Sequence, residues 1–127
     1  MSVNLVGPLK SGLAVGGNGA ATANADSSMP LQGLLLGVYI QYNDSPPATT
    51  DVTVKTKGTS PYAPSYNLLV FPNANTNGLF MVRGAVVDTA GAAIAGQYEL
   101  IPIDDIVNVA IAQADAGDSV DVWLLMV

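Results

Sequence analysis

Hydrophobic and polar residues alternate along much of the chain from Leu31 onward, which is the pattern of a β-strand with one buried face. In Leu34–Tyr42 every even position is large and apolar, and in Asp51–Lys57 the valines alternate with polar or charged residues. The closing segment Ser119–Val127 alternates in the same way. Four further segments are predicted as strands: Asn67–Phe71, Leu79–Val87 (one strand, or two broken near Gly84), Gln97–Ile103 and Ile106–Gln113.

Turn-forming residues separate these segments at intervals of about 8–12 residues, which is typical of a β-sandwich or barrel. Prolines, glycines and serines predict open loops over Asn43–Thr50 and Gly58–Ser65. A further strand at Val3–Val6 would bring the predicted number of strands to about eight. The alternative for Asp104–Ala114 is a helix, but its β-branched residues at alternate positions favour a strand. The sequence therefore predicts an all-β fold.

The first thirty residues differ from the rest of the chain. Gly12–Pro30 consists mainly of Gly, Ala, Asn and Ser, and side chains this small bury too little area to offset the entropy lost on ordering. We therefore predict an irregular N-terminal arm over residues 1–30 and a sandwich domain over residues 31–127. Two explanations of an ordered arm stay open, namely contact with a partner and packing on its own domain.

Composition limits the classes of partner. The 127 residues include ten acidic and four basic ones, which gives a net charge of −6. Phosphate would repel such a chain, so nucleic acid is not an expected partner, and no Lys/Arg cluster suits an anionic membrane. Half of the residues are hydrophobic but only 11% are charged, which indicates that a partner covers some apolar surface. No signal peptide is recognisable, so we expect a soluble protein made in a cytoplasm.

The residues that most often carry catalysis are missing or badly placed. The chain has neither His nor Cys, so it lacks the commonest general base and the usual zinc ligands. Asp104 and Asp105 are adjacent and would point to opposite faces of a strand, and Glu99 is expected on a solvated face. The spacing of Asp115, Asp118 and Asp121 fits an exposed turn better than a calcium loop. We predict that the protein is not an enzyme and has no catalytic, cofactor or metal site.

The closing strand predicts a surface that binds a partner. Its core-facing set would be Val120, Val122, Leu124 and Met126, yet the opposite face also carries the large apolar residues Trp123, Leu125 and Val127. Such a patch is uncommon on soluble monomers. We predict a subunit interface centred on Trp123, because buried Trp commonly anchors interfaces. The alternative is that loops or the N-terminal arm cover both faces of this strand.

The stretch Leu31–Val127 resembles small structural proteins of tailed bacteriophages. The segments that carry the resemblance are Gly33–Tyr42 (GLLLGVYIQY), Thr49–Thr56 (TTDVTVKT), Asn73–Thr76 (NANT), Pro102–Gln113 (PIDDIVNVAIAQ) and Gly117–Leu125 (GDSVDVWLL). They are similar to the cement, or head-decoration, proteins that sit outside phage capsids. Members of that group are jelly-roll or immunoglobulin-like sandwiches that assemble as dimers or trimers on the shell. The resemblance offers no match for the Gly/Ala/Asn-rich arm.

The resemblance implies an antiparallel β-sandwich of the jelly-roll type that stabilises a phage capsid by bridging its capsomers. The expected partners are the major capsid protein and further copies of the chain, as a homodimer or homotrimer. The expected location is the outer surface of the virion. A carbohydrate- or receptor-binding module is the main alternative, with a stacking platform drawn from Tyr39, Tyr42, Tyr62, Tyr66 and Trp123. A fibre or tail subunit that donates residues 1–30 to a neighbour is the third.

Overall fold

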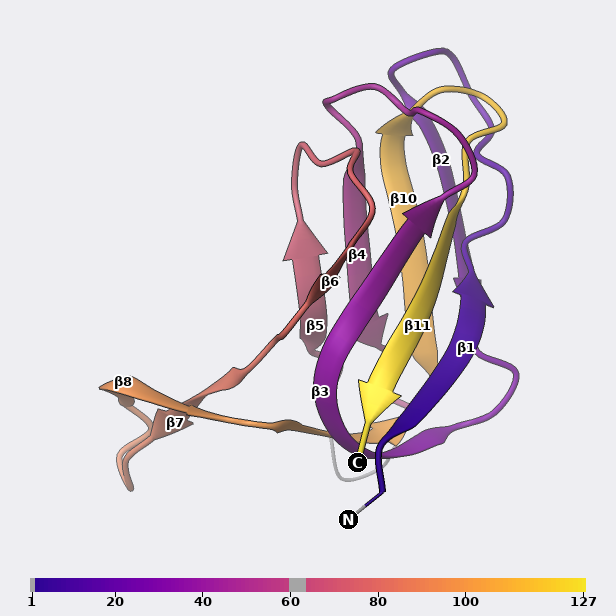
Figure 1. Ribbon diagram of the computed structural model, residues 1–127. Coiled ribbons are helices and arrows are strands. Elements are labelled where there is room, and N and C mark those ends of the chain that lie inside the picture. Colours follow the sequence, from indigo (N-terminus) through magenta and orange to yellow (C-terminus); the bar gives the residue numbers. More distant parts are fainter. Residues whose placement is uncertain (1, 60–63) are drawn as a thin grey trace.

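The computed structural model describes residues 2–59 and 64–127, and within them the chain forms two stacked β-sheets and a separate two-stranded ribbon (Figure 1). The first sheet has the strand order β1-β11-β3-β6, with β9 also paired to β3, and the second has the order β2-β10-β4-β5. The ribbon consists of β7 and β8. The strands are β1 Asn4–Lys10, β2 Ala21–Asp26, β3 Leu31–Tyr42, β4 Asp51–Thr56, β5 Asn67–Phe71, β6 Gly78–Phe80, β7 Gly84–Val87, β8 Ala93–Glu99, β9 Ile101–Asp105, β10 Val107–Ala114 and β11 Val120–Met126.

The predicted all-β sandwich is confirmed. All of the strand pairs in the two sheets are antiparallel, and the core lies between the sheets. The alternation predicted for the closing strand is also observed, since each even residue of β11 is buried and each odd residue is partly exposed. The largest fully buried side chains come mainly from strands β3, β4, β10 and β11: Leu35, Val38, Ile40, Val52, Val54, Val107, Val109, Ile111, Val120, Val122 and Leu124.

The prediction of an irregular N-terminal arm is wrong, because residues 1–30 contribute a strand to each sheet. Strand β1 pairs with β11, and β2 pairs with β10. Between them Ser11 is buried, and its Oγ accepts a hydrogen bond of 3.0 Å from the Val120 amide. Ala14 and Ala21 belong to the core. Of the two explanations for an ordered arm, packing on its own domain is therefore the one observed.

Three other strand predictions are refined by the structure. Leu79–Val87 contains two strands, as one alternative proposed, since β6 ends at Phe80 and β7 begins at Gly84. The single strand expected over Gln97–Ile103 is two strands, because β8 belongs to the ribbon and β9 to the first sheet. The alternative of a helix over Asp104–Ala114 is wrong, since this segment holds the end of β9 and all of β10.

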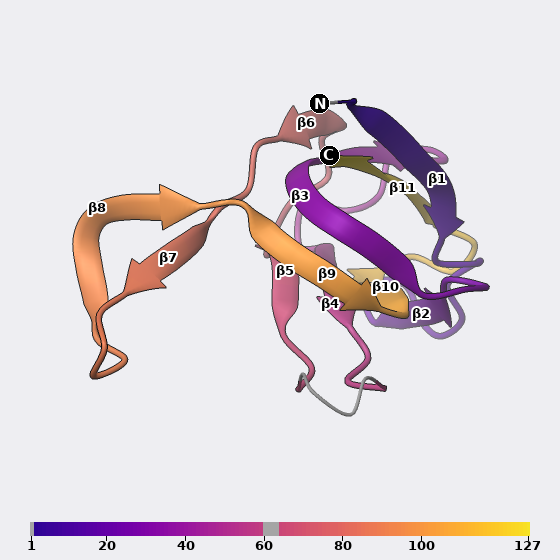
Figure 2. The same cartoon turned by 90° about the horizontal axis from the view of Figure 1, so that it is seen from below.

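The ribbon projects sideways from one end of the sandwich (Figures 1 and 2). Every residue of β8 is exposed. At the opposite end of the sandwich, hydrogen bonds join the loops that follow β1, β3 and β10, for example from Ala14 N to Asp118 O and from Asn43 N to Ser119 O. No helix in the described part of the chain is long and apolar enough to cross a membrane.

Candidate functional site

The outer face of the first sheet carries a cluster of large apolar side chains, which we call the apolar face: Leu5, Tyr39, Leu79, Trp123 and Leu125. The strand register creates it. Leu5 on β1 lies opposite Leu125 on β11, Trp123 lies opposite Tyr39 on β3, and Tyr39 lies opposite Leu79 on β6. These outward residues alternate with core residues, so one sheet is apolar on both sides.

A depression of about 340 Å³ lies on this face, lined by the five residues and Gln41. Trp123 and Tyr39 meet edge to face, with ring centroids 5.5 Å apart and an interplanar angle of 63°. The Trp123 ring also lies close to Gly7, where an added Cβ would come within 3.0 Å of its Cδ1 atom. Trp123 is thus held in place from two sides, while Leu5 and Leu79 are 61% and 52% exposed.

The apolar face is almost uncharged. No charged residue lines its depression, and Lys10 and Asp121 lie opposite each other further along the pairing of β1 and β11. Val127, predicted as part of the interface, lies just beyond the end of β11, and its backbone exchanges two 2.9 Å hydrogen bonds with Leu34. It does not line the depression. Sequence analysis missed Leu5, Tyr39 and Leu79. The even-numbered core face predicted for Leu34–Tyr42 is observed only from Val38 onward, because Leu34 is exposed and Leu35 is fully buried.

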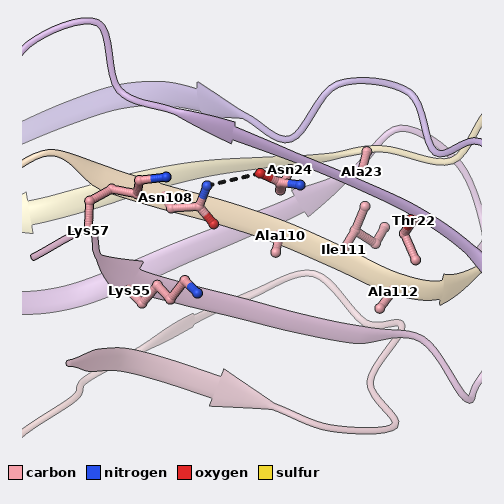
Figure 3. Close-up of a pocket in the computed structure, with 9 residues that line it drawn as sticks. All are labelled: Thr22, Ala23, Asn24, Lys55, Lys57, Asn108, Ala110, Ile111 and Ala112. Carbon is pink, nitrogen blue, oxygen red and sulfur yellow. Dashed lines mark hydrogen bonds between the residues drawn. The ribbon is translucent and has the colours of Figure 1, made fainter. Parts of the chain in front are cut away.

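The outer face of the second sheet is polar and holds a shallow groove of about 300 Å³ (Figure 3). Lys55 and Lys57 lie toward one end, and the small residues Ala110 and Ala112 line its middle and other end. The Asn108 side-chain amide donates to Asn24 Oδ1 (3.2 Å) and to Asp26 Oδ1 (2.8 Å).

Asp26 lies beside this groove, and two neighbouring side chains favour its charged form. The hydrogen bond from Asn108 lowers the pKa of Asp26, and Lys57, whose Nζ lies 3.4 Å from Asp26 Oδ2, lowers it further. A carboxylate held in its charged form is a poor general acid at neutral pH. The groove therefore offers polar recognition and no proton donor from Asp26.

The adjacent carboxylates of β9 point to opposite sides, as predicted. Asp104 is exposed and accepts a 2.9 Å hydrogen bond from Gln32. Asp105 is buried and accepts hydrogen bonds from the amides of Gly58 (2.6 Å) and Ile106 (2.7 Å), and from the amide and hydroxyl of Thr59. The Thr59 hydroxyl is the main cause of a lowered pKa for Asp105, followed among the favourable contacts by the backbone amides. Asp105 thus tethers a loop.

The aspartates near the last turn are less exposed than predicted, since Asp115 and Asp121 are partly buried and Asp118 is buried. Asp118 is buried, and its Oδ2 accepts from the Asp115 amide at 2.9 Å. A hydrogen bond with the Asp118 carboxyl also raises the pKa of Asp44. Within residues 2–59 and 64–127, no group of three or more acidic side chains is placed to hold a metal ion. Glu99 is exposed on β8, as expected.

The aromatic residues do not form one stacking platform. Tyr42 is buried and its hydroxyl donates to the Ala74 carbonyl at 2.6 Å, while the Tyr66 hydroxyl donates to the Pro102 carbonyl. Tyr62 lies outside the described residues. Only Tyr39 and Trp123 come together among the described members of that set, and their rings are tilted rather than coplanar.

The chain matches no known family model and no curated protein sequence. Three features of its surface could contact a partner: the apolar face, the polar groove and the projecting ribbon.

Proposed function

We propose that the protein is a structural component of a tailed-bacteriophage virion, a cement protein that binds the outer capsid surface and bridges capsomers. The observation that carries this proposal is the apolar face, because a sandwich that is apolar on both sides of one sheet has a surface suited to another protein. The sequence resemblance of residues 31–127 supplies the identity of the assembly. The major capsid protein and further copies of the chain are the proposed partners.

Bridging requires contact surfaces in more than one place. Besides the apolar face, the loop after β1 exposes Leu13 (66%) and Val15 (77%) at the end of the sandwich opposite the ribbon. A subunit with one apolar contact on a sheet face and another at one end of the sandwich can join two neighbours. A standard interface buries about 1,600 Å² in total, so the stabilisation of the shell would come from many moderate contacts repeated by symmetry.

We also infer that the sandwich is a jelly roll. Leaving out β7, β8 and β9, the remaining eight strands lie in the order first-eighth-third-sixth in one sheet and second-seventh-fourth-fifth in the other. This order supports the inference because successive strands cross between the sheets, except for the fourth and fifth, which pair within one sheet, as they do in an eight-stranded double Greek key. In this description, β7, β8 and β9 are an insertion between the sixth and seventh strands.

The acidic surface suits this location. A net charge of −6 gives the chain no attraction for packaged DNA, and it favours the outside of the shell over the inside. Fibre-type donation of residues 1–30 to a neighbour is disfavoured, since β1 and β2 already pair with strands of their own chain.

A carbohydrate-binding module is the second candidate, and the polar groove favours it. Lysine and asparagine side chains along a floor of alanines can hydrogen-bond sugar hydroxyls. Binding to a glycan array that Lys55→Ala abolishes and Leu5→Asp leaves intact would favour this function over the cement function.

The test of the cement function is purification of intact particles of the phage that encodes the chain. We expect the protein to co-purify with filled heads in a copy number that is a simple multiple of the capsomer number, and to be removed by protease without loss of DNA. Its absence from purified heads, or a copy number of only a few per particle, would overturn the proposal.

A further inference from the structure

The ribbon of β7 and β8 has little support from its own subunit. It forms a sheet of its own, and in the described part of the chain neither strand pairs with the two main sheets. An isolated two-stranded ribbon is marginally stable in water, and packing against another surface is what normally stabilises it. The body of its own chain does not supply that surface, because the ribbon points away from it (Figures 1 and 2).

The base of the ribbon is nevertheless fixed. The Arg83 guanidinium, immediately before β7, donates 2.6 Å hydrogen bonds to the carbonyls of Leu36 and Val82. Leu36 belongs to β3, so the ribbon leaves the sandwich in a set direction. An element that is fixed at its base and unpartnered along its length is pre-organised for a neighbour, which reduces the entropy lost on binding.

One side of the ribbon has the chemistry of a contact surface. Tyr98 lies opposite Ala85, and Val87 lies opposite Ala93, so each pair shares a side of the ribbon. Tyr98 is 65% exposed and Val87 is 54% exposed. The charged groups of the two strands and their turn are Glu99, at the base, and Asp88, whose carboxylate accepts hydrogen bonds from the turn amides of Ala90 and Ala92.

The apolar face is similar in chemistry to the exposed side of the ribbon. The residues that line the apolar face are uncharged, as are the paired ribbon residues that include Tyr98 and Val87, whereas the chain as a whole carries −6 and repels a second copy elsewhere. The apolar face offers a depression lined by leucines and two aromatic rings, and the ribbon offers a tyrosine and small aliphatic side chains. Two copies therefore have complementary surfaces that one copy cannot bring together.

We propose that the ribbon of one copy docks on the apolar face of a second copy. The inference rests on the proposed function, since it names the copy-to-copy contact of that assembly. The two surfaces differ, so the contact is head-to-tail, and each subunit gives one ribbon and receives one. Such a contact forms a ring where the rotation between neighbours closes and an open filament where it does not. The strands of the ribbon have only 4 and 7 residues, fewer than the roughly 20–30 per side of a standard interface. Two such contacts per subunit are therefore needed for a stable assembly.

The experiment compares a ribbon variant, a face variant and their mixture, all as full-length chains, with a control variant. The ribbon variant, Val87→Asp with Tyr98→Asp, places charges on exposed positions and leaves the apolar face intact. The face variant, Leu5→Asp, charges the apolar face at an exposed position and leaves the ribbon intact; Trp123→Ser is a second face variant. Val70→Asp is the matched control, because Val70 on β5 of the second sheet is 54% exposed, as Val87 is.

Sedimentation equilibrium of each variant and of an equimolar mixture gives the result. We expect each variant alone to need at least about a tenfold higher concentration to associate than the wild type, and Val70→Asp to behave as the wild type. The mixture should form a 1:1 dimer, since one intact ribbon then meets one intact face. A ribbon variant that keeps the wild-type mass, a mixture that stays monomeric or a monomeric wild type would each overturn the proposal.

The mixture separates this inference from the cement function. Failure of the mixture to associate overturns the ribbon contact even where the protein is found on heads. Association of the mixture supports the contact even where the protein is absent from heads.

Discussion

Leu124 and Leu125 are neighbours on β11 that lie on opposite sides of the first sheet, and truncating each to Ala separates folding from assembly. Leu124 is fully buried between the sheets, whereas Leu125 is partly exposed on the apolar face. Leu124→Ala removes three buried carbon groups, at about 0.8 kcal/mol each, and leaves a cavity. We therefore expect it to lower the free energy of unfolding by about 2–5 kcal/mol.

Leu125→Ala should change the stability of the monomer little and weaken its association. Part of the Leu125 side chain is already in contact with water, so its truncation should lower the free energy of unfolding of the monomer by less than about 1 kcal/mol. It should nevertheless weaken association, because Leu125 lines the proposed contact surface. Leu124→Ala, in contrast, should associate normally under conditions in which it is folded.

The assay is urea unfolding followed by the fluorescence of Trp123, the single tryptophan, at a dilution that leaves the wild type monomeric. With a slope of about 1–3 kcal/mol per molar urea, Leu124→Ala should lower the midpoint by about 1 M or more. Sedimentation of the same proteins at high concentration measures association. If Leu125→Ala destabilised the monomer as much as Leu124→Ala does, the apolar face would be part of the folding core and the reasoning would be wrong.

Three more predictions follow from named contacts. The pKa of Asp105 is lowered in the folded state, so its contribution to stability is present above the unfolded pKa of about 4 and is lost as the pH falls below it. Asp105→Asn should therefore reduce the loss of stability at acid pH, measured by urea titrations at several pH values. Burial raises the pKa of Tyr42 to about 12, so the stability it contributes is complete below about pH 10 and is lost as the pH rises toward 12. Tyr42→Phe should reduce this alkaline loss. At neutral pH it should lower the free energy of unfolding by about 1 kcal/mol, because it removes the hydrogen bond to Ala74, and thermal melts measure both effects. Deletion of residues 1–30 should abolish folding, because it removes β1, β2 and the buried Ala14 and Ala21, and a cooperative melt of the truncated protein would contradict this.

The sequence predicted the strands whose alternation uses large side chains. In β11 each inward residue is Val, Leu or Met, and the burial pattern follows the sequence pattern along the whole strand. Strand β2 was missed because its alternation uses alanine. In Ala21–Asp26 every second residue is Ala and faces inward, with Thr, Asn and Asp outward, but alanine buries too little area to distinguish this pattern from a flexible tract.

The candidate site was predictable only in part. Trp123 and Leu125 were identified because they are apolar on the outward side of an amphipathic strand. Leu5, Tyr39 and Leu79 come from strands β1, β3 and β6, and only the pairing register brings them beside Trp123. The projection of the ribbon was not predictable either, because β8 carries Ile94 and Tyr98 and so resembles a buried strand, although all seven of its residues are exposed.

The central claim is that the protein strengthens a capsid through its apolar face, and an add-back measurement tests it most directly. Heads stripped of the protein are mixed with the wild type or with Leu5→Asp, and the temperature at which they release DNA is recorded. We expect the wild type to raise this temperature and Leu5→Asp, at the same concentration and equally folded, to raise it much less. A release temperature that the wild type leaves unchanged would contradict the account.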